Sequence, residues 1–149
     1  MSNTLRKDIQ RLGYGGLIPF AALALAVWAV PTGQRHFFTL ALAAYSATIV
    51  SFLGGIHWGL GFQMGEAAPR MHFFWGVTPP LFAWLALLLP AWAGLVLLAL
   101  ILAACYGIDR NSYPATGLAR WLPMRQQLTI VAVLSCLSGA AAAWTSTRY

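Results

Sequence analysis

An uncharged apolar run of 35 residues, Phe73 to Gly107, constrains the fold more than any other feature of the chain. As a single helix rising about 1.5 Å per residue, the run would be about 52 Å long. The hydrocarbon core of a bilayer is only about 30 Å thick, so the run must fold back on itself. We expect the break at Pro90, because proline removes a helical donor and clashes with the preceding turn. This gives two spans, over residues 73–89 and 91–107.

The composition of the chain also indicates a membrane protein. Hydrophobic residues make up 60% of the 149 and charged residues 8%, and the mean hydropathy is +0.70. Soluble domains carry about a quarter charged residues. Three more apolar runs cover residues 12–30, 37–62 and 128–144. The sequence therefore predicts an all-α, polytopic membrane helix bundle, with about five transmembrane helices in a single integral membrane domain over residues 1–149.

The basic residues predict the orientation, because Lys and Arg near span ends are retained in the cytoplasm. Of the nine, all but two fall on one side of the predicted spans. The amino terminus is thus expected in the cytoplasm and the carboxyl terminus on the opposite side. The larger group comprises Arg6, Lys7, Arg11, Arg70, Arg110, Arg120 and Arg125, and the smaller comprises Arg35 and Arg148. Anchoring beside anionic headgroups accounts for the net charge of +6, so the expected partner is the lipid bilayer and not nucleic acid.

The beginning of the chain allows two structures before the first span. Leu5, Ile9 and Leu12 recur at helical spacing among basic and polar residues, as in an amphipathic helix on the membrane surface. A solvated tail is the alternative. The same region looks like a signal peptide, but Pro19 interrupts its apolar stretch. We therefore expect the segment to be retained.

Small residues in the second span predict close helix packing. Ser51, Gly55 and Gly59 follow Ala47 at four-residue spacing and form a ridge that another helix backbone could approach. Gly54 lies on the opposite side, near His57. The predicted packing positions are thus Ser51, Gly54, Gly55 and Gly59, with this span at the centre of the bundle.

Polar side chains gather in the predicted cytoplasmic half of the bundle. The candidate ligand-binding residues there are Tyr14, His57, Trp58, Asp109 and Arg125. A carboxylate at a bilayer boundary is costly unless it is paired, so Asp109 should pair with Arg110, Arg125 or a protonated His57. The group could be a structural staple, a ligand or headgroup site, or a proton-handling site.

Residues for catalysis or metal binding do not stand out. No nucleophile and base form a recognisable set, and the Cys and His residues lack the spacing of a zinc site. Cys105 and Cys136 are expected to be small apolar packing residues. We predict no catalytic and no metal-ligating residues, and the sequence indicates no particular cofactor.

Two motif blocks carry a resemblance to a known family. Tyr14-Gly15-Gly16-Leu17-Ile18-Pro19-Phe20 and Gly54-Gly55-Ile56-His57-Trp58-Gly59, with Asp109 and Arg125 further on, resemble the transmembrane protein 69 family, or domain of unknown function 3429. The resemblance covers nearly the whole chain. It implies a multi-pass protein of bacterial inner membranes, or of mitochondria in eukaryotes, and it implies no reaction. Pro123 departs from the pattern, where a more helical run into Arg125 is expected.

Two functions follow from these features. The favoured one is a nonenzymatic scaffold, assembly or accessory component of a larger membrane complex, because the sequence predicts glycine-rich packing ridges, few buried ionisable groups and no soluble catalytic domain. The alternative is a protein that binds or transports a small ligand, quinone or lipid headgroup in a cytoplasmic-side pocket around His57. A bundle cavity with a few convergent polar groups is the expected form of such a pocket. An intramembrane enzyme is the least favoured of the three classes.

Overall fold

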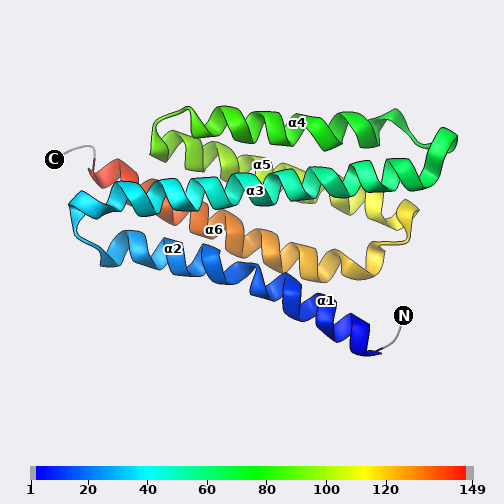
Figure 1. Ribbon diagram of the computed structural model, residues 1–149, viewed down its shortest axis with the longest axis horizontal. Coiled ribbons are helices and arrows are strands. Elements are labelled where there is room, and N and C mark those ends of the chain that lie inside the picture. The colour runs from blue at the N-terminus through cyan, green and yellow to red at the C-terminus, as the bar shows by residue number, and fades with distance from the viewer. Residues whose placement is uncertain (1–2, 147–149) are drawn as a thin grey trace.

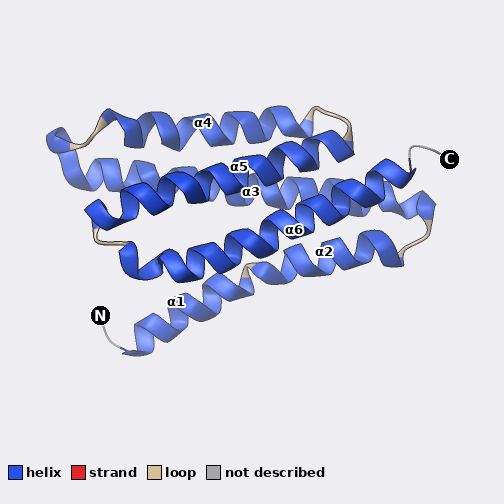
Figure 2. Cartoon of the chain, turned by 180° about the vertical axis from the view of Figure 1, so that it is seen from behind, coloured by secondary structure: helices blue, strands red, loops and turns tan. Residues whose placement is uncertain are grey.

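The computed structural model describes residues 3–146, and within them the chain is a bundle of α-helices without strands (Figure 1). Helices α2 to α6 run along one axis and connect through short turns (Figure 2). α1 extends from α2 beyond the bundle, so the two form one bent helical segment. The bounds are α1 Asn3–Gly15, α2 Leu17–Ala29, α3 Thr32–Met64, α4 Arg70–Leu87, α5 Ala91–Ser112 and α6 Leu122–Ser146.

The long apolar run folds into a hairpin at the predicted proline. α4 ends at Leu87 and α5 begins at Ala91, directly after Pro90. Gly94 lets the two helices meet closely just beyond the turn, since a Cβ there would collide with the backbone oxygen of Ala86.

The segment between the last two predicted spans, residues 108–127, is mostly helical, so α5 and α6 extend beyond those spans. α5 continues past Gly107 to Ser112, and 3₁₀ turns over Tyr113–Thr116 and Ala119–Trp121 lead into α6. α6 begins six residues before the expected Leu128. Pro123 is its second residue, where a missing backbone N–H costs no helical hydrogen bond. The departure from the family pattern at Pro123 is therefore compatible with a helical run through Arg125.

Among the residues that the structure describes, four helical stretches are long and apolar enough to cross a membrane: residues 3–29, 32–67, 91–116 and 119–146. The segment before the first predicted span is thus a helix and not a tail. α4 is not among the four, because Arg70, His72 and the Pro79-Pro80 pair lower its hydropathy. Its 18 residues would nevertheless reach about 27 Å, and it lies alongside α3 (Figure 1). Crossing by α4 remains an expectation.

α3 is central, as predicted, since it contacts α2, α4, α5 and α6. Its buried Leu42 and Val50 join Leu95 and Leu98 of α5 and Cys136 of α6 in the apolar core. The free end of α1, the α3–α4 turn and the α5–α6 turn lie at one end of the bundle, and the α2–α3 turn lies at the other (Figure 1). The basic residues grouped together by the sequence thus share one end.

Candidate functional site

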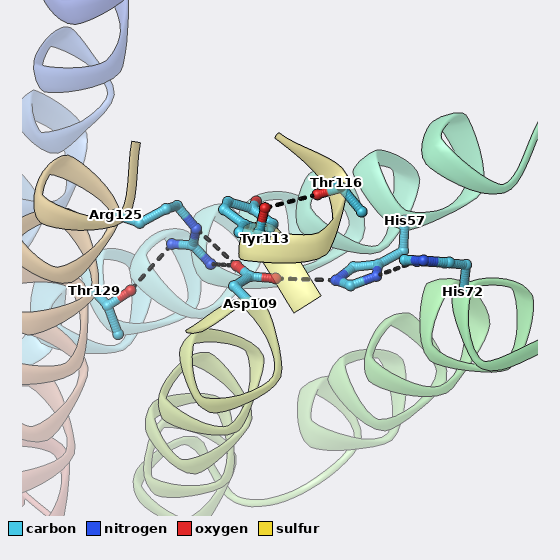
Figure 3. A network of polar contacts seen from close by, with 7 residues as sticks. All are labelled: His57, His72, Asp109, Tyr113, Thr116, Arg125 and Thr129. Atoms are coloured by element: carbon cyan, nitrogen blue, oxygen red, sulfur yellow. Dashed lines mark hydrogen bonds and ion pairs between the residues drawn. The ribbon is translucent and has the colours of Figure 1, made fainter. Parts of the chain in front are cut away.

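A chain of buried polar side chains crosses the bundle near its basic end. It joins residues of four helices: His72 of α4, His57 of α3, Asp109 of α5, and Arg125 and Thr129 of α6 (Figure 3). All five are at least nine-tenths buried. No other cluster of ionisable groups in the described core connects as many helices.

Asp109 is the centre of this chain. Its Oδ2 accepts hydrogen bonds from Arg125 Nε at 2.9 Å and from Arg125 Nη2 at 2.6 Å. Its Oδ1 lies 3.0 Å from His57 Nε2. Of the partners expected for Asp109, the structure thus provides Arg125 and His57 and leaves Arg110 exposed. A buried carboxylate paired and hydrogen-bonded in this way avoids the cost of an isolated buried charge.

The Nδ1 atoms of the two histidines face each other, which limits how the two rings can be protonated. His57 Nδ1 lies 3.1 Å from His72 Nδ1, so one nitrogen must donate and the other must accept. With His57 Nε2–H donating to Asp109, a neutral His57 accepts from His72, and a charged His57 donates to it. Both rings cannot be charged without losing the contact. Burial, and then the neighbouring His57, lower the pKa of His72.

Two glycines bring the histidines together. A Cβ on Gly54 of α3 would collide with the backbone oxygen of Gly76 on α4, and a Cβ on Gly76 would collide with the ring of Trp58. His57 lies one turn after Gly54, and His72 lies one turn before Gly76. Close backbone contact one turn away therefore sets the short distance between the rings.

A cavity of about 680 Å³ reaches the other end of the polar chain. Its walls come from α1, α2, α3, α5 and α6 and are almost entirely apolar, with Phe20, Leu53 and Ala132 among them. Arg125 and Thr129 line its polar end together with Tyr113, whose ring lies beside Arg125 and Asp109 (Figure 3). Arg125 is the one charged side chain among the described residues that line it.

The structure brings together three of the five candidate ligand-binding residues, His57, Asp109 and Arg125. Tyr14 lies apart: it is 41% exposed, donates to Gln127 Oε1 and lines a separate surface hollow of about 610 Å³. Trp58 is 39% exposed, and its Nε1 donates to the Phe73 carbonyl of α4 at 2.9 Å. Its contacts are those of a packing residue. Neither side chain lines the cavity that reaches Arg125.

The packing ridge expected on α3 lies on the wrong face for contacts within the chain. Ser51, Gly55 and Gly59 are exposed, and a Cβ on either glycine would meet no atom within 4 Å. Gly54 packs against α4, and Gly61 on the same side packs against Phe73. The large aromatic and histidine side chains of α4 pack against the side of α3 that carries His57. The ridge therefore lies outside the interface between α3 and α4.

His72, Tyr113 and Thr129 complete the site but were not among the candidates. Position relative to a turn carried a usable signal for Asp109 and Arg125. Asp109 and Arg125 lie eight residues before and eight after Gly117, the residue with positive φ in the α5–α6 turn. Antiparallel helices place residues equally far from a turn at a similar depth. His57 and His72 lack this symmetry, since they lie eight residues before and three residues after the α3–α4 turn at residues 65–69. In the described part of the chain, no three His, Cys, Asp or Glu side chains are arranged to hold a metal ion.

Comparison with known proteins places this arrangement in a family. The profile of the family described as "Protein of unknown function (DUF3429)" matches residues 5–141, which include the whole polar chain. Transmembrane protein 69 of Xenopus tropicalis is 37% identical over 133 residues, covering 83% of this chain and 50% of the relative. The chain therefore spans about half the length of that curated relative. No solved structure matches this chain. This membrane protein belongs to the transmembrane protein 69-like family, domain of unknown function 3429.

Proposed function

We propose that this protein binds a small amphipathic molecule, such as a quinone or a lipid, in the cavity between α1, α2, α3 and α6. The observation that carries the proposal is the cavity itself, whose apolar wall ends at the buried Arg125 and Thr129. Its volume of about 680 Å³ lies within the range of roughly 300 to 1,000 Å³ typical of ligand pockets. An apolar wall accommodates a hydrocarbon tail, and the polar end receives a head.

The rim of the cavity supports entry of the ligand from the bilayer. Leu12 of α1 and Phe52 of α3 both line the cavity, and they are 78% and 65% exposed. A mouth bordered by exposed apolar side chains costs little beside lipid and is unfavourable in water. An amphiphile dissolved in the membrane could therefore enter sideways.

Mass spectrometry of small molecules that copurify with the protein tests this proposal. The wild type is compared with Ala132→Phe, which puts an aromatic ring into the cavity wall, and with Ala141→Phe, on the exposed face of the same helix. We expect one amphiphile enriched over bulk lipid in the wild type and in Ala141→Phe and lost from a folded Ala132→Phe. Equal lipid profiles for all three proteins would contradict a specific cavity ligand.

A scaffold or assembly role in a larger membrane complex is the second candidate, and one observation favours it. The ridge of Ser51, Gly55 and Gly59 is exposed and free of neighbours within the described chain, and such a face suits a helix of another protein. Affinity purification in mild detergent should then recover a partner with the wild type and lose it with Gly55→Leu. Recovery of the same proteins with both forms would contradict this role.

For the location we propose a bacterial inner membrane with the basic end in the cytoplasm. The basic residues gathered around α1 and the α3–α4 and α5–α6 turns support this orientation. In that orientation the polar chain and the head of the ligand lie near the cytoplasmic side.

A further inference from the structure

We propose that the ligand of this cavity has an uncharged head with hydrogen-bond acceptor oxygens, such as the carbonyls of a quinone. The inference rests on the proposed function and assigns a chemical class to the ligand. It follows from the donors and the charges at the polar end of the cavity.

Donors outnumber acceptors at this end. Arg125 has five N–H groups, and three of them are used, by Nε and Nη2 to Asp109 and by Nη1 to Thr129. The Tyr113 hydroxyl also interacts with Arg125 and Asp109, so at most one of the two remaining N–H groups is left free. Thr129 Oγ1 accepts from Arg125 at 3.0 Å, and the hydroxyl hydrogen of Thr129 has no acceptor among residues 3–146. A ligand that accepts hydrogen bonds would therefore satisfy donors that the protein leaves free.

The charge of Arg125 is already balanced, which argues against an anionic head. Asp109 Oδ2 contacts two nitrogens of the guanidinium group, the nearer at 2.6 Å. An anion bound to the remaining N–H group would lie close to this carboxylate in surroundings of low dielectric, where like charges repel strongly. No second Lys or Arg among the described residues lines the cavity to offset that repulsion.

An uncharged carbonyl oxygen gains the same hydrogen bonds without this repulsion. It needs no counter-charge, and it carries two lone pairs that could accept from Arg125 and Thr129 together. A purely apolar molecule would leave the donors unsatisfied, which is costly in a buried site. Of the three kinds of head, the uncharged acceptor therefore suits this cavity best.

Thermal melting of the protein in detergent, with three probes of similar tail length, tests the assignment. The probes are decylbenzoquinone, with an uncharged acceptor head, decyl phosphate, with an anionic head, and decylbenzene, which lacks an acceptor. A ligand that binds only the folded protein raises the melting temperature according to its affinity. We expect the largest rise with decylbenzoquinone. The same probes are measured with Ala132→Phe. The melting shift of this variant shows how much of the effect arises from partition of the probe into the detergent micelle.

Two variants at one position check that the head lies at the polar end. Thr129→Val removes the hydroxyl group and keeps the shape of the side chain, and Thr129→Ser keeps the hydroxyl group. Loss of one hydrogen bond should weaken decylbenzoquinone binding roughly two- to tenfold in Thr129→Val. Thr129→Ser should bind as the wild type does.

The results separate this inference from the proposed function. A larger rise with decyl phosphate or decylbenzene than with decylbenzoquinone, or equal quinone affinity in Thr129→Val and Thr129→Ser, would overturn the uncharged acceptor head and leave the cavity as a binding site. If no probe stabilises the wild type more than a folded Ala132→Phe, the cavity is not a binding site and the proposed function fails with the inference.

Discussion

Asp109 holds the polar chain together, because its two oxygens bind side chains from two other helices. Oδ2 compensates the Arg125 guanidinium group, and Oδ1 fixes His57 through Nε2. Without the carboxylate, Arg125 would remain as a buried, unpaired charge. The cost of breaking such a pair exceeds the cost of replacing both of its members.

A double-mutant cycle should expose this imbalance. Asp109→Leu and Arg125→Met should each lower the free energy of unfolding by about 3 to 5 kcal/mol, since each leaves one uncompensated charge. The double variant should lose less than the sum of the two, because no buried charge remains. Chemical unfolding in detergent measures all four proteins. Strictly additive losses would show that the two side chains do not act as a pair.

His72 should make the stability of the protein depend on pH. Because burial lowers the pKa of His72 below its ordinary value of 6.5, the unfolded chain binds more protons than the folded one just below pH 6.5. The contribution of His72 to the free energy of unfolding is complete above pH 6.5. It is lost as the pH falls toward the lower pKa that His72 has in the folded state. The melting temperature should therefore fall between about pH 7.5 and 5.5 in the wild type.

His72→Gln is the control for this dependence, since glutamine stays uncharged over that range. Its melting temperature should change less with pH than that of the wild type. Equal pH dependence of the two proteins would assign the effect to another group, such as the exposed His36.

At the scale of helices, two adjacent glycines of α3 should respond oppositely to alanine. Gly54→Ala puts a Cβ into the backbone of Gly76 and should cost about 1 to 3 kcal/mol through overpacking. Gly55 has open space around it, so Gly55→Ala should be neutral or stabilising by up to about 1 kcal/mol through helix propensity. Melting temperatures in the same detergent compare the two. Destabilisation by both changes to the same extent would contradict the packing of α3 on α4.

The sequence predicted helices and turns better than it predicted contacts between helices. Length and proline chemistry alone placed the hairpin at Pro90, and the cost of a lone carboxylate pointed from Asp109 to Arg125 and His57. The side of α3 that packs could not be found in this way, since small residues occur on both of its sides. Only the approach of α4, with Gly76 against Gly54, distinguishes the two sides.

At the scale of the whole molecule, five helical segments run lengthwise: α1 with α2, then α3, α4, α5 and α6. They place the start of α1 and the end of α6 at opposite ends of the bundle (Figure 1). A reporter that is active only outside the cytoplasm, fused after Tyr149, should therefore be active, with the basic end in the cytoplasm. The same reporter fused within the α5–α6 turn, after Gly117, should be inactive. An active fusion after Gly117 together with an inactive fusion after Tyr149 would show that the orientation is the reverse of the predicted one.

The cavity is the central feature of the whole molecule, and a crystal structure grown from a lipidic mesophase tests it most directly. The protein would be extracted from its own membrane with no ligand added. We predict elongated density between α1, α2, α3 and α6, with its head about 3 Å from Arg125 and Thr129. A cavity closed by α1 packing down onto α6, with no density inside it, would contradict a binding function for this protein.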